Sequence, residues 1–271
     1  MSEAAAQSPP ATAAGCEPPL RTVQEGNRLR CVLNRPEALN ALTPELLFKL
    51  GEVVRAADSD DSIRAVTVEG AGQRAFSAGF DIKVLDALGA EAHRGQPLEV
   101  ATGALSSCRK PTIAVIRGHC VGAGFDLAMS CDFRLAATGS KFSVPAIRIG
   151  TVYRPQAIER IWRVLGPSVT KALFVVGRGF SAEDALRVGI VDELAQPDEL
   201  ESVVASWSSI PDKGEFASTA HKQIIEAFSA TADRDEAFWA PLNELRRRSV
   251  ESKERRSALR DFTNRSRAGR D

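Results

Sequence analysis

The sequence predicts an α/β protein in which strands and helices alternate over most of the chain. Apolar runs at 65–68 and 111–116 have the composition of buried strands, and segments with helical spacing of apolar residues lie between such runs. From about residue 197 onward only helical patterns follow. This alternation favours a parallel sheet with right-handed crossovers. We expect the C-terminal helices to form a separate layer.

The first elements are expected to be strands at 21–25 and 28–34, because Gly26 and Asn27 form a hairpin signal between them. Thr43 then predicts the start of a helix, with Pro44 in its first turn. A glycine-rich loop is expected at 69–75, a helix beginning at 81–88, and a polar segment at 89–96. The remaining expected helices are 98–108, 122–129, 156–165, 168–176, 181–188, 197–207, 216–228 and 233–262, and the remaining strands are 111–116, 132–136, 141–143 and 190–194.

The overall charge excludes a strong general attraction to nucleic acid. Lys plus Arg and Asp plus Glu both total 35 among 271 residues. No segment approaches the about 18 consecutive apolar residues of a membrane span. The Ala-, Ser- and Pro-rich first 20 residues are expected to form a disordered tail, not a signal peptide. We therefore expect a cytoplasmic protein without a membrane or nucleic-acid partner.

Cysteine and histidine usage gives no metal motif. The five cysteines form no CxxC pair, and the three histidines are scattered. Cys31, Cys120 and Cys131 lie in apolar surroundings, which predicts buried thiols in a reducing compartment.

Two glycine-bearing turns carry the strongest functional signal. Residues 76–82 read Phe-Ser-Ala-Gly-Phe-Asp-Ile, and residues 118–126 read Gly-His-Cys-Val-Gly-Ala-Gly-Phe-Asp. Each follows a short strand-like run, and the second opens a helical pattern. Such turns can aim two backbone N–H groups at one oxygen, which is the arrangement of an oxyanion hole. The pair predicts chemistry on a thioester or a similar carbonyl.

The C-terminal segment is locally basic. Its arginines and lysines fit either a solvated helix face, or a site for ligand phosphates or a subunit contact. They are Arg246, Arg247, Arg248, Lys253, Arg255, Arg256, Arg260, Arg265, Arg267 and Arg270.

Four ordered segments resemble the signatures of the enoyl-CoA hydratase/isomerase (crotonase) superfamily. They are 33–42 (Leu-Asn-Arg-Pro-Glu-Ala-Leu-Asn-Ala-Leu), 75–82, 116–128 and 181–191. The resemblance runs from about residue 22 to 262. It implies a spiral of ββα units at 21–196 and a helical region at 197–271 that packs homotrimers or homohexamers. It also implies an acyl-CoA substrate, with coenzyme A as part of the thioester, no tightly bound cofactor and no metal.

The resemblance also assigns site residues. The oxyanion-hole N–H groups map to Phe80 and Ala123, within turns that contain Ala78 and Gly122. Backbone near Ala38, Leu39, Asp81 and Ile82 would lie along the CoA.

The chain departs from the hydratase pattern at both catalytic carboxylates. Hydratases of this family hold one water between two glutamates; here the matching residues are Asp126 and Ala146. Alanine can neither accept nor deliver a proton, so hydration by the usual route is not expected to be efficient. Asp126 fits either a structural role at the positive end of a helix or a single base acting on an enolate.

Tyr153 and Arg154 suggest a further activity. Tyr153 is the only tyrosine, and its position resembles that of a tyrosine in methylmalonyl-CoA decarboxylase, although that relative has His where Phe80 stands. Arg154 either binds a substrate carboxylate or lies on the surface.

Arg148 either faces solvent or pairs with Asp126 or Glu159. The favoured function is therefore that of a lyase or isomerase of the hydratase/isomerase family. The alternatives are a decarboxylase of a substituted malonyl-CoA and a non-catalytic acyl-CoA-binding protein.

Overall fold

The computed structural model describes residues 17–81, 96–149 and 152–230, and isolated positions between 240 and 257. A six-stranded sheet has the order β1-β2-β3-β5-β7-β10. Its strands are β1 (Leu20–Glu25), β2 (Arg28–Leu33), β3 (Ala65–Gly70), β5 (Thr112–Ile116), β7 (Phe133–Ala137) and β10 (Glu193–Ala195). Only the β1–β2 hairpin is antiparallel; the other neighbours are parallel, as the alternation of strands and helices predicts.

A second, four-stranded sheet has the order β4-β6-β8-β9. Its strands are β4 (Ala75–Ser77), β6 (His119–Val121), β8 (Lys141–Ser143) and β9 (Phe180–Ser181). β4, β6 and β8 are parallel, so their carboxyl ends lie at one edge. Each strand has only two or three residues, too few for a periodic pattern, and the sequence therefore predicted no second sheet.

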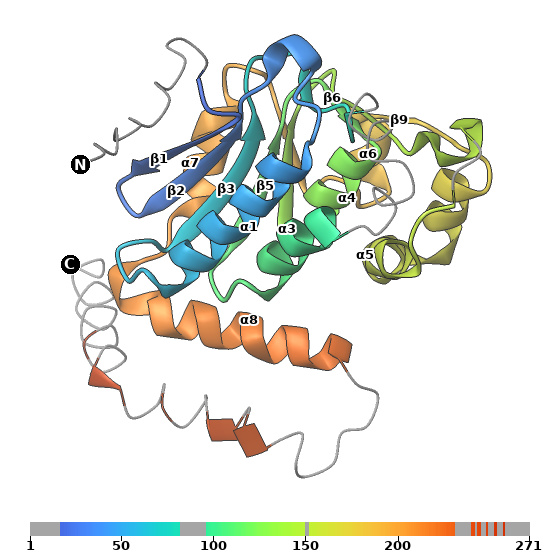
Figure 1. Ribbon diagram of the computed structural model, residues 1–271. Helices are drawn as coiled ribbons and strands as arrows, with labels where there is room; N and C mark the ends of the chain where they lie inside the picture. The colour runs from blue at the N-terminus through green and yellow to red at the C-terminus, as the bar shows by residue number, and fades with distance from the viewer. Residues whose placement is uncertain are drawn as a thin grey trace, which may run out of the picture.

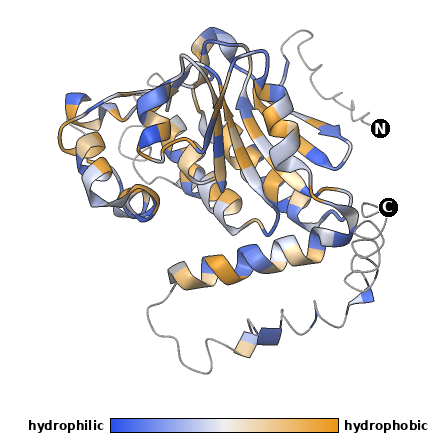
Figure 2. Ribbon diagram, turned by 180° about the vertical axis from the view of Figure 1, so that it is seen from behind, coloured by the Kyte–Doolittle hydropathy of each residue, from blue (hydrophilic) through white to orange (hydrophobic). Residues whose placement is uncertain are grey.

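Helices cover both faces of the large sheet (Figure 1). α1 (Pro44–Ser59) and α3 (Gln96–Ser107) pack side by side on one face, and α7 (Leu200–Ser208) lies on the other. Strand β5 shows why: Ala114 and Ile116 join the larger core, whereas Ile113 and Val115 pack in a cluster with Leu200 of α7. Figure 2 shows apolar residues concentrated on the strands of this sheet.

The remaining helices surround the second sheet and the base of the molecule. They are η1 (Pro36–Ala38), α4 (Ala123–Met129), η3 (Pro145–Ile149), α5 (Pro155–Phe174), α6 (Ala182–Arg187), η4 (Asp212–Gly214) and α8 (Glu215–Ala230). α8 runs beneath the body in Figure 1. Its Lys222 Nζ lies 2.5 Å from Asp132 Oδ2 and donates to Lys110 O at 3.1 Å, which ties α8 to the start of β7 and β5.

Most expected elements are confirmed with small shifts. Thr43 caps α1 by accepting a hydrogen bond from Leu46 N at 3.3 Å. The helices expected at 156–165 and 168–176 form α5, which is interrupted at Gly166 (φ 69°). The strand expected at 190–194 is wrong in position: β10 begins at Glu193, because the N–H groups of Ile190 and Val191 donate to Ala185 O, at 2.9 and 3.2 Å, at the end of α6.

The expected helices at 81–88 and 233–262 lie largely outside the described residues. No helix of the described residues is long and apolar enough to cross a membrane. Four of the five cysteines are described, and all four are free and buried.

Candidate active site

The two glycine-bearing turns lie in contact at the carboxyl edge of the second sheet. Gly79 has a φ of +95°, and a Cβ placed on it would lie 3.1 Å from Val121 O and 3.3 Å from Ala123 N. Gly124 in α4 likewise approaches β4, since a Cβ there would lie 2.6 Å from Ser77 Cβ. Adjacent parallel strands β4 and β6 deliver both turns to one place, and glycine permits the close approach.

In this arrangement the backbone N–H groups of Phe80 and Ala123 take no part in the hydrogen bonds that join the neighbouring segments. The Leu42–Phe80 bridge uses Leu42 N, which donates to Gly79 O at 2.8 Å, and Asp81 N, which donates to Leu42 O at 3.0 Å. The Phe80 N–H takes no part in it. Ala123 is the first residue of α4, so its N–H has no acceptor within the helix. Across the described residues, no hydrogen bond is recorded from either N–H.

Asp126 lies in the first turn of α4 and is only 1% exposed. Its Oδ1 lies 3.1 Å from Nε of Arg160 in α5. Burial raises the pKa of the Asp126 carboxyl; the Arg160 charge and hydrogen bond oppose that rise, and the Glu99 charge adds to it. The structure thus holds a proton-binding group next to the turns.

Tyr153 lies at the same place. A Cβ on Gly122 would lie 3.4 Å from Tyr153 Oη, and the Tyr153 ring packs edge-on against Phe174 with centroids 5.1 Å apart. Burial, followed by the Asp126 charge, raises the pKa of the Tyr153 phenol well above its usual value. The hydroxyl therefore stays neutral at physiological pH.

Arg154 does not lie free on the surface. Its Nη2 lies 2.8 Å from Oε1 of Glu99 on α3, so a carboxylate of the protein itself occupies the place expected for a substrate carboxylate. The sequence analysis missed Glu99. Its only signal is helical spacing, because Glu99, Thr102 and Ser106 fall on one face of α3.

Of the two alternatives for Arg148, the structure has the solvent-facing one, because Arg148 is exposed at the end of η3. Arg160 pairs with Asp126 instead, and Arg163 pairs with Glu159 at 2.7 Å. Arg160 lies on the side of α5 that faces α4.

Ala146 is 3% exposed in η3, directly after Pro145. Pro145 Cδ lies 4.0 Å from the position of a Gly122 Cβ, so η3 forms part of the wall around the second turn. Ala146 therefore contributes a buried methyl group to this wall.

Residues 33–42 support the turn that contains Gly79. Leu39 and Asn40 have left-handed backbones, with φ of 51° and 55°. The fully buried Asn40 side chain donates to Ala71 O and Ala75 O at 3.0 and 2.7 Å. Ala78 N donates to Leu39 O at 2.9 Å, and the loop that begins at Ala38 is thereby joined to the turn.

Asp81 is held from the same loop. Its Oδ2 lies 2.9 Å from Nη2 of Arg35, and Arg35 Nη1 donates to Ala41 O at 2.8 Å. Ile82 lies outside the described residues.

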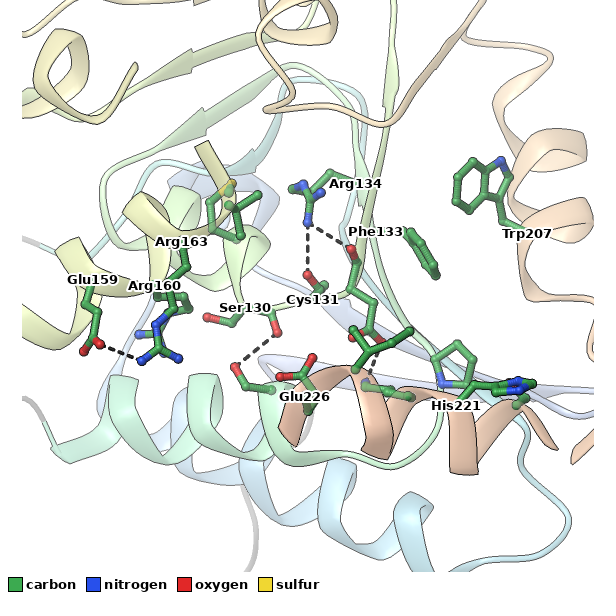
Figure 3. A pocket seen from close by; sticks show the side chains of 18 of the residues that line it. Ser130, Cys131, Phe133, Arg134, Glu159, Arg160, Arg163, Trp207, His221 and Glu226 are labelled. Carbon is green, nitrogen blue, oxygen red and sulfur yellow. Dashed lines mark hydrogen bonds and ion pairs between the residues drawn. The ribbon is translucent and has the colours of Figure 1, made fainter. Parts of the chain in front are cut away.

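A separate cavity of about 880 Å³ lies between α5, α8 and the start of β7 (Figure 3). Arg160, Glu159 and Arg163 line one side, and His221 and Glu226 of α8 line another. Phe80, Ala123 and Tyr153 do not line it. Arg160 therefore stands between this cavity and Asp126. The described residues include no cluster of His, Cys, Asp and Glu suited to a metal ion.

Comparison with known proteins identifies the family of this chain. The enoyl-CoA hydratase/isomerase family model matches residues 27–267. A crotonyl-CoA hydratase of Syntrophomonas wolfei is 33% identical over 188 residues, which cover 68% of this chain and 72% of that protein. A carnitinyl-CoA dehydratase of Escherichia coli K12 is 32% identical over 182 residues, covering 67% and 69%.

Solved structures show the same fold. A crystal structure of an enoyl-CoA hydratase/carnithine racemase from Magnetospirillum magneticum has a TM-score of 0.85 and 29% identity, covering 92% of this chain and 94% of that one. Because the family model spans most of the sequence, this chain belongs to the enoyl-CoA hydratase/isomerase family.

Proposed function

We propose that this protein is an acyl-CoA-processing enzyme that stabilises a thioester enolate at the N–H groups of Phe80 and Ala123. One observation carries the proposal: the two turns are in contact, and neither N–H donates a hydrogen bond to another described residue. Donors fixed before the substrate arrives stabilise developing negative charge without reorganising. Coenzyme A would enter as part of the substrate, along Ala38, Leu39, Ala78, Asp81 and Ile82.

Asp126 is the group proposed to move a proton on this enolate. It is buried beside the second turn, and burial raises its pKa, which favours a carboxyl that can both hold and release a proton. Both addition of water to an enoyl thioester and migration of its double bond place negative charge on the thioester oxygen. The protein is thus a lyase or isomerase in which Phe80, Ala123 and Asp126 act together.

Tyr153 is proposed to act as a neutral hydrogen-bond donor beside Gly122. Its hydroxyl keeps its proton because burial raises the phenol pKa. Ala146 is proposed to shape the acyl pocket. We further propose that the helical region from residue 197 assembles homotrimers or homohexamers, and that the enzyme works in the cytoplasm.

Decarboxylation of a substituted malonyl-CoA is supported less well. Glu99 already pairs with Arg154, and a malonyl carboxylate would approach a region that also holds Asp126. A non-catalytic binder would need no proton-transferring group beside the turns, where Asp126 is buried despite the cost of desolvation.

The proposal is tested by hydrogen exchange at the α-carbon of a saturated thioester. Butyryl-CoA is incubated in D₂O with the full-length protein and followed by mass spectrometry. Reversible enolate formation replaces α-hydrogen by deuterium, and Asp126→Asn should abolish it while binding of butyryl-CoA persists. Binding without exchange would favour the non-catalytic alternative. A panel of enoyl, 3-hydroxyacyl and malonyl thioesters then identifies the net reaction.

A further inference from the structure

Addition of water to an enoyl thioester needs both a proton acceptor and a proton donor, and Asp126 can supply one of the two. Ala146 cannot supply the second group. Glu99 is the carboxylate that the fold brings to the region from another element, because α3 packs against α4.

The register of these two helices places Glu99 near the glycine turn. Ser106 Oγ of α3 donates to Ser130 O at the end of α4, at 3.4 Å. Glu99 lies seven residues before Ser106, or about two turns toward the start of α3. Its partner Arg154 follows Tyr153, whose hydroxyl adjoins Gly122 at the start of α4. Two independent contacts therefore place Glu99 toward the N-terminal end of α4.

The two carboxylates have different surroundings. Asp126 is 1% exposed, and burial favours its protonated form. The side chain of Glu99 is 41% exposed and forms an ion pair with Arg154, so water reaches it. Arg160 of α5 faces Asp126, Arg154 faces Glu99, and the charge of Glu99 acts on Asp126. Carboxyls in such contrasting environments are suited to opposite proton-transfer roles.

We propose that Glu99 supplies the second carboxylate of this site and accepts the proton of the water that adds to a 2-enoyl thioester. This inference rests on the proposed function and gives Glu99 a role within it. Water oxygen bonds to C3 while one water proton passes to Glu99. The C2–C3 π electrons form the enolate held by Phe80 and Ala123, and protonated Asp126 then delivers its proton to C2. Solvent removes the proton from Glu99 and restores that of Asp126.

The test compares two reactions of the same full-length variants. Hydration of crotonyl-CoA requires both carboxylates, whereas α-exchange of butyryl-CoA requires Asp126 alone. Glu99→Gln should lower kcat/KM for hydration about 100-fold or more. It should keep exchange within about threefold of the unsubstituted protein, because the oxyanion donors and Asp126 remain. Retained exchange also shows that the variant is folded.

Two variants separate proton transfer from anchoring of α5. Arg154→Met breaks the same ion pair but keeps the Glu99 carboxylate, and hydration should fall less than about tenfold, below the range of a lost general base. Glu159→Gln removes an exposed carboxylate of α5 that pairs with Arg163, and should leave both reactions unchanged.

The outcomes distinguish the two proposals. The role of Glu99 is overturned if Glu99→Gln hydrates crotonyl-CoA within about threefold of the unsubstituted rate, because loss of a general base has a far larger effect. Equal losses of both reactions in Glu99→Gln and Arg154→Met also overturn it, because they assign the pair to anchoring. Exchange without hydration of any 2-enoyl thioester by the unsubstituted protein overturns Glu99 but leaves enolate formation standing. Absence of exchange in the unsubstituted protein overturns the proposed function itself.

Discussion

Nε of Arg160 lies 3.1 Å from Oδ1 of Asp126, and this ion pair joins α5 to the first turn of α4. The carboxylate is 1% exposed, whereas 23% of the Arg160 side chain is exposed. Burial and the neighbouring cation therefore act in opposite directions on the Asp126 pKa, and burial is the larger effect. The cation that opposes protonation of the proposed catalytic group also lines the neighbouring cavity.

Arg160→Met should move the pH dependence of α-exchange to higher pH. Exchange requires the ionised Asp126, and loss of the neighbouring cation raises the pKa of this carboxyl. The acidic limb of the exchange rate for butyryl-CoA should therefore shift to higher pH, with little change in KM. Arg160→Lys keeps the charge and should shift the limb less. An unmoved limb in Arg160→Met would show that this ion pair does not control proton transfer.

Asp126→Asn should change stability in a pH-dependent way. The folded-state pKa of Asp126 lies above its ordinary value of 3.8, so between these two pKa values the folded state binds more protons than the unfolded state. The contribution of Asp126 to stability is thus fully present below the unfolded pKa and is lost as pH rises through the folded pKa. The difference in unfolding free energy, variant minus unsubstituted protein, should increase as pH rises from the unfolded pKa through the folded pKa. Urea denaturation at several pH values measures it, and a constant or decreasing difference contradicts the raised pKa.

Gly124→Ala should separate the two turns. Its new Cβ would lie 2.6 Å from Ser77 Cβ and 2.9 Å from Ser77 O, so α4 must move away from β4. We expect a stability loss of about 1–3 kcal/mol from overpacking and a much larger loss of α-exchange.

Gly103→Ala in α3 is the matched control. A Cβ at Gly103 meets no atom within 4 Å, so this helical substitution should stabilise the protein by about 0.5–1 kcal/mol and preserve exchange. Thermal unfolding and the exchange assay measure both variants. Equal activity of the two variants would argue that the contact between the turns is not required.

The sequence predicted the elements that carry strong local signals. Thr43 and Pro44 specify the start of α1, and Gly26 and Asn27 specify the β1–β2 hairpin. The two turns were predicted because their glycines are contiguous motifs. Their contact depends on strands β4 and β6, which are too short to show a period.

The partners of the site were harder to predict. Arg160 and Glu99 reach Asp126 and Arg154 from other helices, and nothing in their local sequence marks them. Arg148 lies nearer to Asp126 in the sequence than Arg160 does. The structure shows instead that the register of α5 against α4 selects Arg160, and a single sequence does not determine such a tertiary contact.

Tyr153 allows one ionisation to be observed directly, because it is the only tyrosine of the chain. Burial and the charge of Asp126 hold the pKa of Tyr153 above its ordinary value of 10.0. Absorbance at 295 nm in the folded protein should therefore show little tyrosinate at pH 10, whereas the protein unfolded in urea should be about half ionised there. Asp126→Asn removes the nearby negative charge and should lower the Tyr153 pKa, with burial still holding it above that of the unfolded chain. A folded-state midpoint near that of the unfolded chain would place the hydroxyl in water, away from Gly122, and would remove Tyr153 from the proposed site.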